Sequence, residues 1–174
     1  FNAASNEYII LSLASAKTNG ASFASTSPTS TVFSAGNDAT NENGSNFVFY
    51  AFAKTPGLIA SGIYTGTNSS DGPMVVVNDG ASGFRPAWVM IKRSDSGTHH
   101  WRVWDAARDP FNKVENYLSP SSNNVEAGPG VGKDLDFTAT GFKIRTTDTD
   151  MNASNGKYIY LTFADQPFNL AKAR

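Results

Sequence analysis

Apolar and polar residues alternate in several short stretches of this chain, which is the pattern of β-strands with two different faces. The stretches 46–53, 87–92, 101–104 and 158–163 are the clearest, and each is predicted to form a core strand. In 47–53 and 158–163 both faces are apolar, which favours the interior of a sheet over its edge.

Residues 87–105 read as a β-hairpin in which a polar loop at 94–98 joins two aromatic-rich strands. In the first strand, Val89 and Ile91 fall on one face, opposite Trp88, Met90 and Lys92. In the second strand the alternation separates two sets of side chains: Trp101, Val103 and Asp105 against Arg102 and Trp104.

Runs rich in Asn, Ser, Gly and Pro separate the strands at roughly 8–12-residue spacing. Residues 106–117 have room for one or two helical turns, but Pro110 interrupts them. The predicted fold is therefore all-β, an antiparallel β-sandwich or jelly roll with at most one or two short helical turns. We expect residues 1–56 to be an N-terminal β segment packed on a C-terminal sandwich of residues 57–174.

A repeated unit of an Asn-rich turn followed by an alternating strand ending in Ala occurs three times. The copies are NAASNEYIILSLA (2–14), NENGSNFVFYAFA (41–53) and NASNGKYIYLTFA (152–164). An approach strand also precedes the last two copies, at 31–33 and 141–144. The alternative is that Asn-Gly turns leading into aromatic strands simply resemble one another.

The composition excludes several classes of function but does not identify a specific function. The net charge of -1 gives no electrostatic footprint for nucleic acid or an anionic membrane, and no apolar run approaches the roughly 20 residues of a membrane span. The absence of cysteine excludes disulfides, thiol catalysis and thiolate metal sites. Because the chain begins with Phe1, we expect it to be processed, truncated or part of something longer.

Two places are candidates for binding. Trp104, Asp105 and Arg108 either form a carbohydrate platform or, as we favour, contain an ion pair that pins the chain to the hairpin. The polar loop 119–133 contributes little to a core, and its hydroxyl and amide groups suit sugar hydroxyls beside an aromatic ring. The candidate residues there are Tyr117, Ser121, Asn123 and Asn124.

No cofactor is expected, and the one metal hypothesis is calcium. Asp148, Asp150 and Asn152 place oxygens at alternate positions, although Asx-rich turns more often cap local structure. His99 and His100 could bind a transition metal, but adjacent residues on a strand point to opposite faces and cannot easily chelate one ion together. An exposed loop pair is the favoured interpretation. No paired carboxylates or catalytic motifs mark the chain as an enzyme.

Several linked motifs resemble a known family. GFRPAWVMIKRSD, WRVWDAAR, YL, GFKIR and KYIYLTFADQPF, in this order, resemble a domain of unknown function. That domain recurs in tail-fibre-like and other virion structural proteins of marine and cyanobacterial tailed phages, and in prophages.

The resemblance implies a surface-exposed virion component, most simply a tail-fibre or tail-associated domain used in host attachment. A capsid decoration protein and a non-catalytic carbohydrate-binding module are the alternatives. The resemblance also implies homo-oligomers, with a trimer favoured, contacts with other virion proteins, and a host surface glycan as a further partner. Composition, independently of the resemblance, predicts no membrane insertion and no nucleic acid as a partner.

Overall fold

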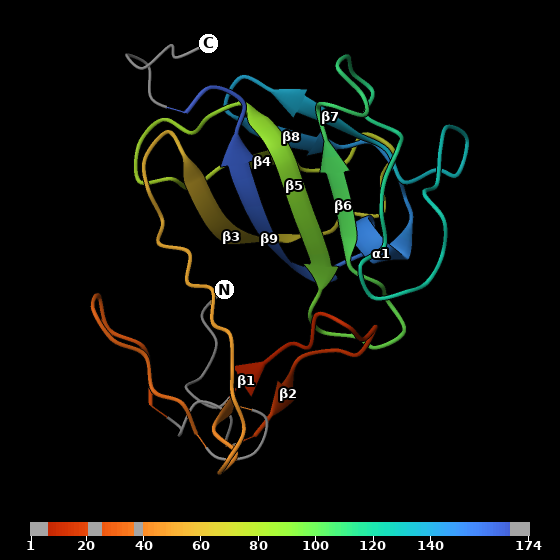
Figure 1. Cartoon of the computed structure of the whole chain (residues 1–174). Helices are drawn as coiled ribbons and strands as arrows, with labels where there is room; N and C mark the ends of the chain where they lie inside the picture. Colours follow the sequence, from red (N-terminus) through yellow and green to blue (C-terminus); the bar gives the residue numbers. More distant parts are fainter. Residues whose placement is uncertain (1–6, 21–25, 37–39, 168–174) are drawn as a thin grey trace.

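Two antiparallel sheets face each other in the computed structural model, which describes residues 7–20, 26–36 and 40–167 (Figure 1). One sheet has the order β3-β9-β5-β6 and the other β4-β8-β7. The first sheet contains β3 (Ile59–Thr65), β9 (Lys157–Ala164), β5 (Pro86–Arg93) and β6 (Arg102–Asp105). The second contains β4 (Met74–Val76), β8 (Gly141–Ile144) and β7 (Leu135–Thr138). The predicted all-β sandwich is confirmed.

The core lies between the two sheets because alternate residues of each strand point inward. On β9, Tyr158, Tyr160 and Thr162 are buried, whereas Ile159 and Leu161 on the opposite face are half-buried. The second sheet contributes inward-facing side chains that are likewise buried: Val75, Leu135, Phe137, Phe142 and Ile144. The two inner faces therefore form one continuous apolar cluster.

The predicted strands at 87–92 and 158–163 are confirmed, and both lie inside the sheet. β9 is hydrogen-bonded to β3 on one side and to β5 on the other. The hairpin is also present, since Trp88 pairs with Asp105 and Ile91 with Arg102. The second strand starts at Arg102, one residue later than predicted.

The prediction for residues 46–53 is wrong, although their pattern matches that of β9. These residues form no strand, and every one of them is exposed. Alternation records that a segment can form a strand, but a strand needs a neighbour, and in the described part of the chain this segment has none. Residues 31–34, a shorter predicted strand, are also irregular.

The N-terminal segments lie below the sandwich in Figure 1 and form a small hairpin of β1 (Glu7–Tyr8) and β2 (Thr18–Asn19). They contact the sandwich through backbone groups: the Trp101 indole donates to the Ile10 carbonyl at 3.0 Å, and the Lys17 amide donates to the Ser94 carbonyl at 3.0 Å. Residues 2–6 of the first repeat copy lie outside the described residues.

The helix that the structure describes, α1 (Thr149–Asn152), lies in the polar turn before β9 and not at 106–117, where helical turns were expected. Asp148 caps it by accepting a hydrogen bond from the Asp150 amide at 2.8 Å. Among the described residues, no helix has the length and apolar character needed to cross a membrane.

Candidate functional site

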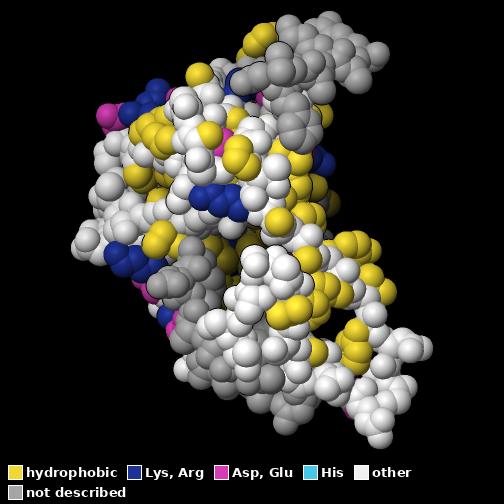
Figure 2. Space-filling view, turned by 90° about the vertical axis from the view of Figure 1, so that its left-hand side faces the viewer, with side chains coloured by type: hydrophobic (Ala, Val, Ile, Leu, Met, Phe, Trp, Pro, Cys, Tyr) yellow, Lys and Arg dark blue, Asp and Glu magenta, His cyan; other side chains and the backbone are white. Residues whose placement is uncertain are grey.

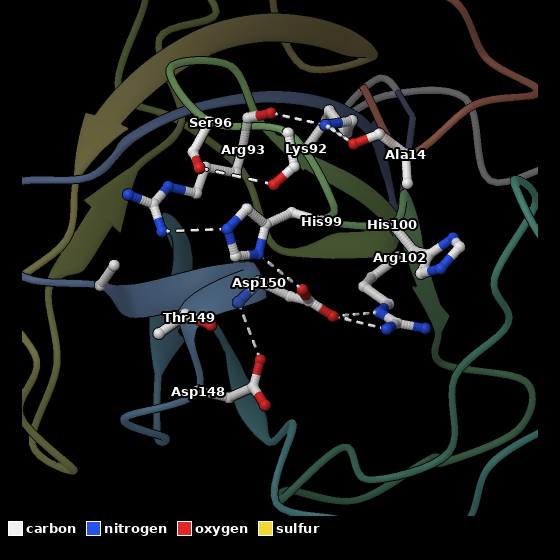
Figure 3. Close-up of polar contacts among 12 residues, drawn as sticks. Ala14, Lys92, Arg93, Ser96, His99, His100, Arg102, Asp148, Thr149 and Asp150 are labelled. Carbon is white, nitrogen blue, oxygen red and sulfur yellow. Dashed lines mark hydrogen bonds and ion pairs between the residues drawn. The ribbon is translucent and has the colours of Figure 1, made fainter. Parts of the chain in front are cut away.

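A buried ionic cluster at one end of the sandwich has Asp150 at its centre (Figure 3). The Arg102 guanidinium on β6 donates to Asp150 Oδ2 through Nε at 2.9 Å and through a second nitrogen at 2.5 Å. His99, in the loop before β6, lies 3.0 Å from Oδ1 through Nδ1. Lys133 Nζ lies 3.4 Å from Oδ2 and also bonds Asp148. The cluster thus joins α1, β6 and two loops.

The tautomer of His99 follows from its partners. Its Nε2 lies 3.2 Å from an Arg93 guanidinium nitrogen, which can only donate. Nε2 must therefore accept the hydrogen bond from Arg93. Nδ1 then carries the ring N–H and donates a hydrogen bond to Asp150. His99 thus bridges the guanidinium of Arg93 and the carboxylate of Asp150.

Burial alone would raise the pKa of Asp150, because it disfavours the charged carboxylate. The hydrogen bonds and charge of Arg102, with smaller contributions from His99 and Lys133, outweigh burial and hold the pKa of Asp150 below its ordinary value. The carboxylate therefore stays ionised at neutral pH, and its charge is balanced locally.

Lys92, on the outer face of β5, is a fully buried cation. Its ammonium donates to the Arg93 carbonyl at 2.7 Å and to the Ala14 carbonyl at 3.3 Å, so it ties the N-terminal segment to the sheet. Desolvation is the main cause that lowers the pKa of Lys92 to about 8, although the charge of Asp150 works in the opposite direction.

This cluster holds α1, β6 and two loops together through ion pairs and hydrogen bonds. Every buried side-chain nitrogen and oxygen in the described residues has a hydrogen-bond partner. Sequence reasoning missed Arg102 and His99 as its members. The available signal was Arg102 itself, since a charged residue on the inward face of an alternating strand requires a buried counterion.

The predicted binding residues Trp104 and Tyr117 belong to the core. Trp104 has an exposed fraction of 0%, its indole donates to the Lys133 carbonyl at 3.1 Å, and its ring lies 5.9 Å from that of Tyr117. Arg102 lies over the other aromatic ring, 5.1 Å from the Tyr117 centroid. Neither ring is available to stack on a ligand, which corrects the platform alternative.

The ion pair expected between Asp105 and Arg108 is present. Asp105 also accepts hydrogen bonds from the Ala107 and Arg108 amides, at 3.1 and 2.9 Å, and thereby closes the turn after β6. Arg108 Nε also donates to the Glu126 carboxylate at 2.7 Å, which connects the turn to the long loop.

The loop 119–133 is irregular as predicted, but it contributes to the core. Ser119 accepts a hydrogen bond from Arg102, and Ser121 Oγ accepts one from the Trp101 amide at 3.1 Å. Ser121 also lies 2.9 Å from His100 Nδ1. Among the predicted binding residues of this loop, Asn123 and Asn124 are exposed, and their binding role stays a prediction.

The calcium candidates are engaged in internal hydrogen bonds. Asp148 caps α1 and pairs with Lys133, and Asp150 holds Arg102. Asn152 is fully buried: its side-chain oxygen accepts from the Thr67 amide at 2.7 Å, and its nitrogen donates to the Ser69 and Thr146 carbonyls. In the part of the chain that the structure describes, no three His, Cys, Asp or Glu side chains gather as a metal site. The histidines are also not an exposed pair, since both are half-buried.

A shallow groove of about 530 Å³ lies at the other end of the sandwich, between the loop after β4 and the chain after β9. Asp79, one of its lining residues, is buried and accepts backbone hydrogen bonds from Gly57, Ala81 and Gly83 at 2.8–3.1 Å. Its carboxylate therefore fixes the surrounding turns. Arg85 and Asp165, which line the mouth, pair with each other at 3.3 Å.

The most distinctive surface feature is residues 46–53, which we call the aromatic arm. Its large side chains are exposed, with exposed fractions of 81% for Val48 and 78% for Tyr50. Phe49 stacks on Phe33 with ring centroids 3.8 Å apart, and Phe52 meets Phe163 of β9 edge to face at 5.7 Å. Figure 2 shows hydrophobic side chains gathered over the lower part of the molecule, at the level of the N-terminal segments in Figure 1.

A clustered apolar surface of this kind marks an interaction site more often than a solvated face.

Comparison with family models identifies one match: a family described as a domain of unknown function, DUF7483, matches residues 2–167. The chain belongs to the DUF7483 family. No curated protein and no solved structure matches it. The matched range, residues 2–167, covers both the N-terminal segments and the sandwich.

Proposed function

We propose that this DUF7483 protein is a structural component of a phage virion, a surface-exposed tail-fibre or tail-associated domain that assembles with copies of itself and takes part in host attachment. The observation that carries the proposal is the aromatic arm, whose exposed apolar side chains need a partner surface. The second support is the resemblance of the linked motifs to a domain of phage structural proteins.

The fold supports a structural role because both ends of the sandwich are held by charged side chains. The Asp150 cluster fixes one end, and the backbone hydrogen bonds of Asp79 fix the other. A rigid sandwich with exposed loop residues such as Asn123 and Asn124 is suited to presenting a binding surface at the outside of a particle.

The carboxylates of the sandwich favour this function over a depolymerase. Asp134 pairs with Lys113 at 2.6 Å, and Asp136 pairs with Arg145 at 2.9 Å. A glycosidase needs one carboxyl group kept protonated and a second facing it across a substrate groove. These two are instead in ion pairs with cations, and neither lines the groove described above.

The test is immunogold labelling of purified particles of the phage that encodes the chain, combined with mass spectrometry of those particles. We expect peptides of the chain in the particles and gold on the tail. Gold on the head would favour the decoration alternative. Particles without the chain would contradict a virion role altogether.

A further inference from the structure

β3 ends the four-stranded sheet and presents an open edge. The Gly66 amide donates to the Gly156 carbonyl and the Ala164 amide to the Leu58 carbonyl, both at 2.9 Å, so the even-numbered residues of β3 face β9. The backbone groups of the odd-numbered residues Ser61, Ile63 and Thr65 therefore point away from β9. In the described part of the chain, no strand lies on that side.

This edge lacks the devices that normally block strand addition. Exposed edges usually have a proline, a charged side chain or a bulge, but the sequence IASGIYT has no proline and no charge. Its pairing with β9 is regular from Ile59 to Thr65. At the open side, only Ile59 is occupied, by Thr55 in the turn that precedes the strand.

The aromatic arm repeats the sequence of the strand that β3 already binds. Residues 46–53 and 157–164 match position by position: Phe47 corresponds to Tyr158, Ala51 to Thr162, and Phe52 and Ala53 to Phe163 and Ala164. The likeness extends to Pro56 and Pro167, three residues after the final Ala in both. One edge of β3 therefore already pairs with a strand of this pattern, β9.

The arm does not fill the open edge of its own β3. The chain turns at Thr55 to reach Ile59, and before that turn Phe52 packs against Phe163, a residue of β9 on the outer face of the sheet. In the described part of the chain, residues 46–53 form no pairing with β3, so the backbone groups of both remain available.

We propose that the aromatic arm of one copy adds as a β-strand to the open edge of β3 in a second copy of this chain. The added strand satisfies the backbone groups of Ser61, Ile63 and Thr65 and buries aromatic side chains that are exposed in the single chain. The proposal rests on the self-assembly in the proposed function and names the surface that performs it. Because each copy has one arm and one edge, the contact forms a reciprocal dimer, a ring or an open filament.

Two pairs of variants test it. Y50P/A51P removes two successive amide N–H groups of the arm, so one that faces β3 is lost in either register, and its control Y50T/A51T keeps both. I63P removes an N–H that points to the open edge and leaves the β9 ladder intact, and its control I63V keeps the N–H. Since residues 50 and 51 are exposed and outside any strand, Y50P/A51P is expected to keep the melting temperature of the chain.

The measurement is sedimentation velocity between about 1 and 100 µM, a range that covers weak self-association. The wild type and both controls are expected to associate, whereas each proline variant weakens association at least about tenfold, as loss of ladder hydrogen bonds predicts. Mixing Y50P/A51P with I63P is then expected to restore a complex, because the first provides an intact edge and the second an intact arm.

Three outcomes would overturn the proposal. They are a monomeric wild type, proline variants that associate as strongly as their controls, and a mixture of the two proline variants that stays monomeric. The second outcome leaves self-assembly and the virion role standing through another surface. Absence of the chain from purified particles removes the virion role without affecting the strand contact, so the two failures are distinguishable.

Discussion

His99 Nδ1 lies 3.0 Å from Asp150 Oδ1, although 51 residues separate the two in the sequence. With Arg102 and Lys133, this contact holds the loop before β6 against α1. The four side chains are mostly buried, so their removal affects stability differently from removal of a surface ion pair.

Asp150→Asn is expected to lower the free energy of unfolding by about 3 kcal/mol, because Arg102 loses its buried counterion. The matched control is Asp165→Asn, which breaks the more exposed pair with Arg85 and is expected to cost less than about 1 kcal/mol. Urea denaturation of both variants and the wild type measures the difference. Equal effects from the two substitutions would mean that the cluster does not stabilise the fold beyond a surface pair.

The pH dependence of that difference has a defined sign. The pKa of Asp150 is lowered in the folded chain, so its contribution is complete above the carboxyl pKa of the unfolded chain, about 3.9. It is lost as the pH falls through the lower pKa of the folded state. The stability gap between wild type and Asp150→Asn is therefore expected to be constant from pH 5 to 7 and to shrink below about pH 4. A gap that instead widens on acidification would contradict the assignment.

Lys92 predicts a second rise of stability with pH, this time at alkaline pH. Because burial lowers the pKa of Lys92 to about 8, the unfolded chain holds this proton more tightly than the folded chain between pH 8 and 10. The free energy of unfolding is expected to rise relative to that of Lys92→Met by about 1 kcal/mol from pH 7 to 9. Thermal or urea unfolding at both pH values provides the comparison. Above pH 10 the raised pKa values of Tyr64 and Tyr158 lower the free energy of unfolding of both proteins as the pH rises.

Strands inside the sandwich were predictable from their apolar patterns. In β9 the two-faced apolar pattern indicates burial on both sides, and the structure places the strand between two neighbours. The same pattern in the aromatic arm led to a wrong prediction. Phe52 and Phe163 occupy equivalent repeat positions, yet one belongs to an exposed segment and the other to a central strand. Alternation indicates which faces a strand would have, and pairing depends on contacts distant in the sequence.

The site was harder to predict because its residues come from separate segments. The sequence predicts Asp148 and Asp150 as calcium ligands because of their oxygens. The cations that pair with them, Lys133 and Arg102, lie on a different loop and strand. Trp104 was placed correctly on the face shared with Arg102, and inward orientation of that face makes it a core residue. Which face of an amphipathic strand turns inward is set by the opposite sheet, which no local pattern reveals.

The structure changes the result expected from replacing the long loop 119–133. From the sequence alone, exchanging residues 119–133 for a short Gly-Ser linker would leave stability nearly unaffected, since the loop has few apolar side chains. The structure shows that both ends of the loop support the core: Ser119 bonds Arg102, and Lys133 provides the carbonyl for Trp104 and an ammonium for Asp150. Full replacement is therefore expected to lower the melting temperature by at least about 10 °C, the scale of losing several buried hydrogen bonds.

A narrower substitution separates binding from stability. N123A/N124A changes exposed amides at the tip of this loop, so its melting temperature is expected to stay within about 2 °C of the wild type. If these amides contact a host glycan, phage carrying N123A/N124A adsorb more slowly, while N43A, at another exposed turn, serves as the control. Unchanged adsorption of the double variant would exclude the loop tip as a receptor contact, and attachment would then have to be sought on the groove lined by Arg85 and Asp165.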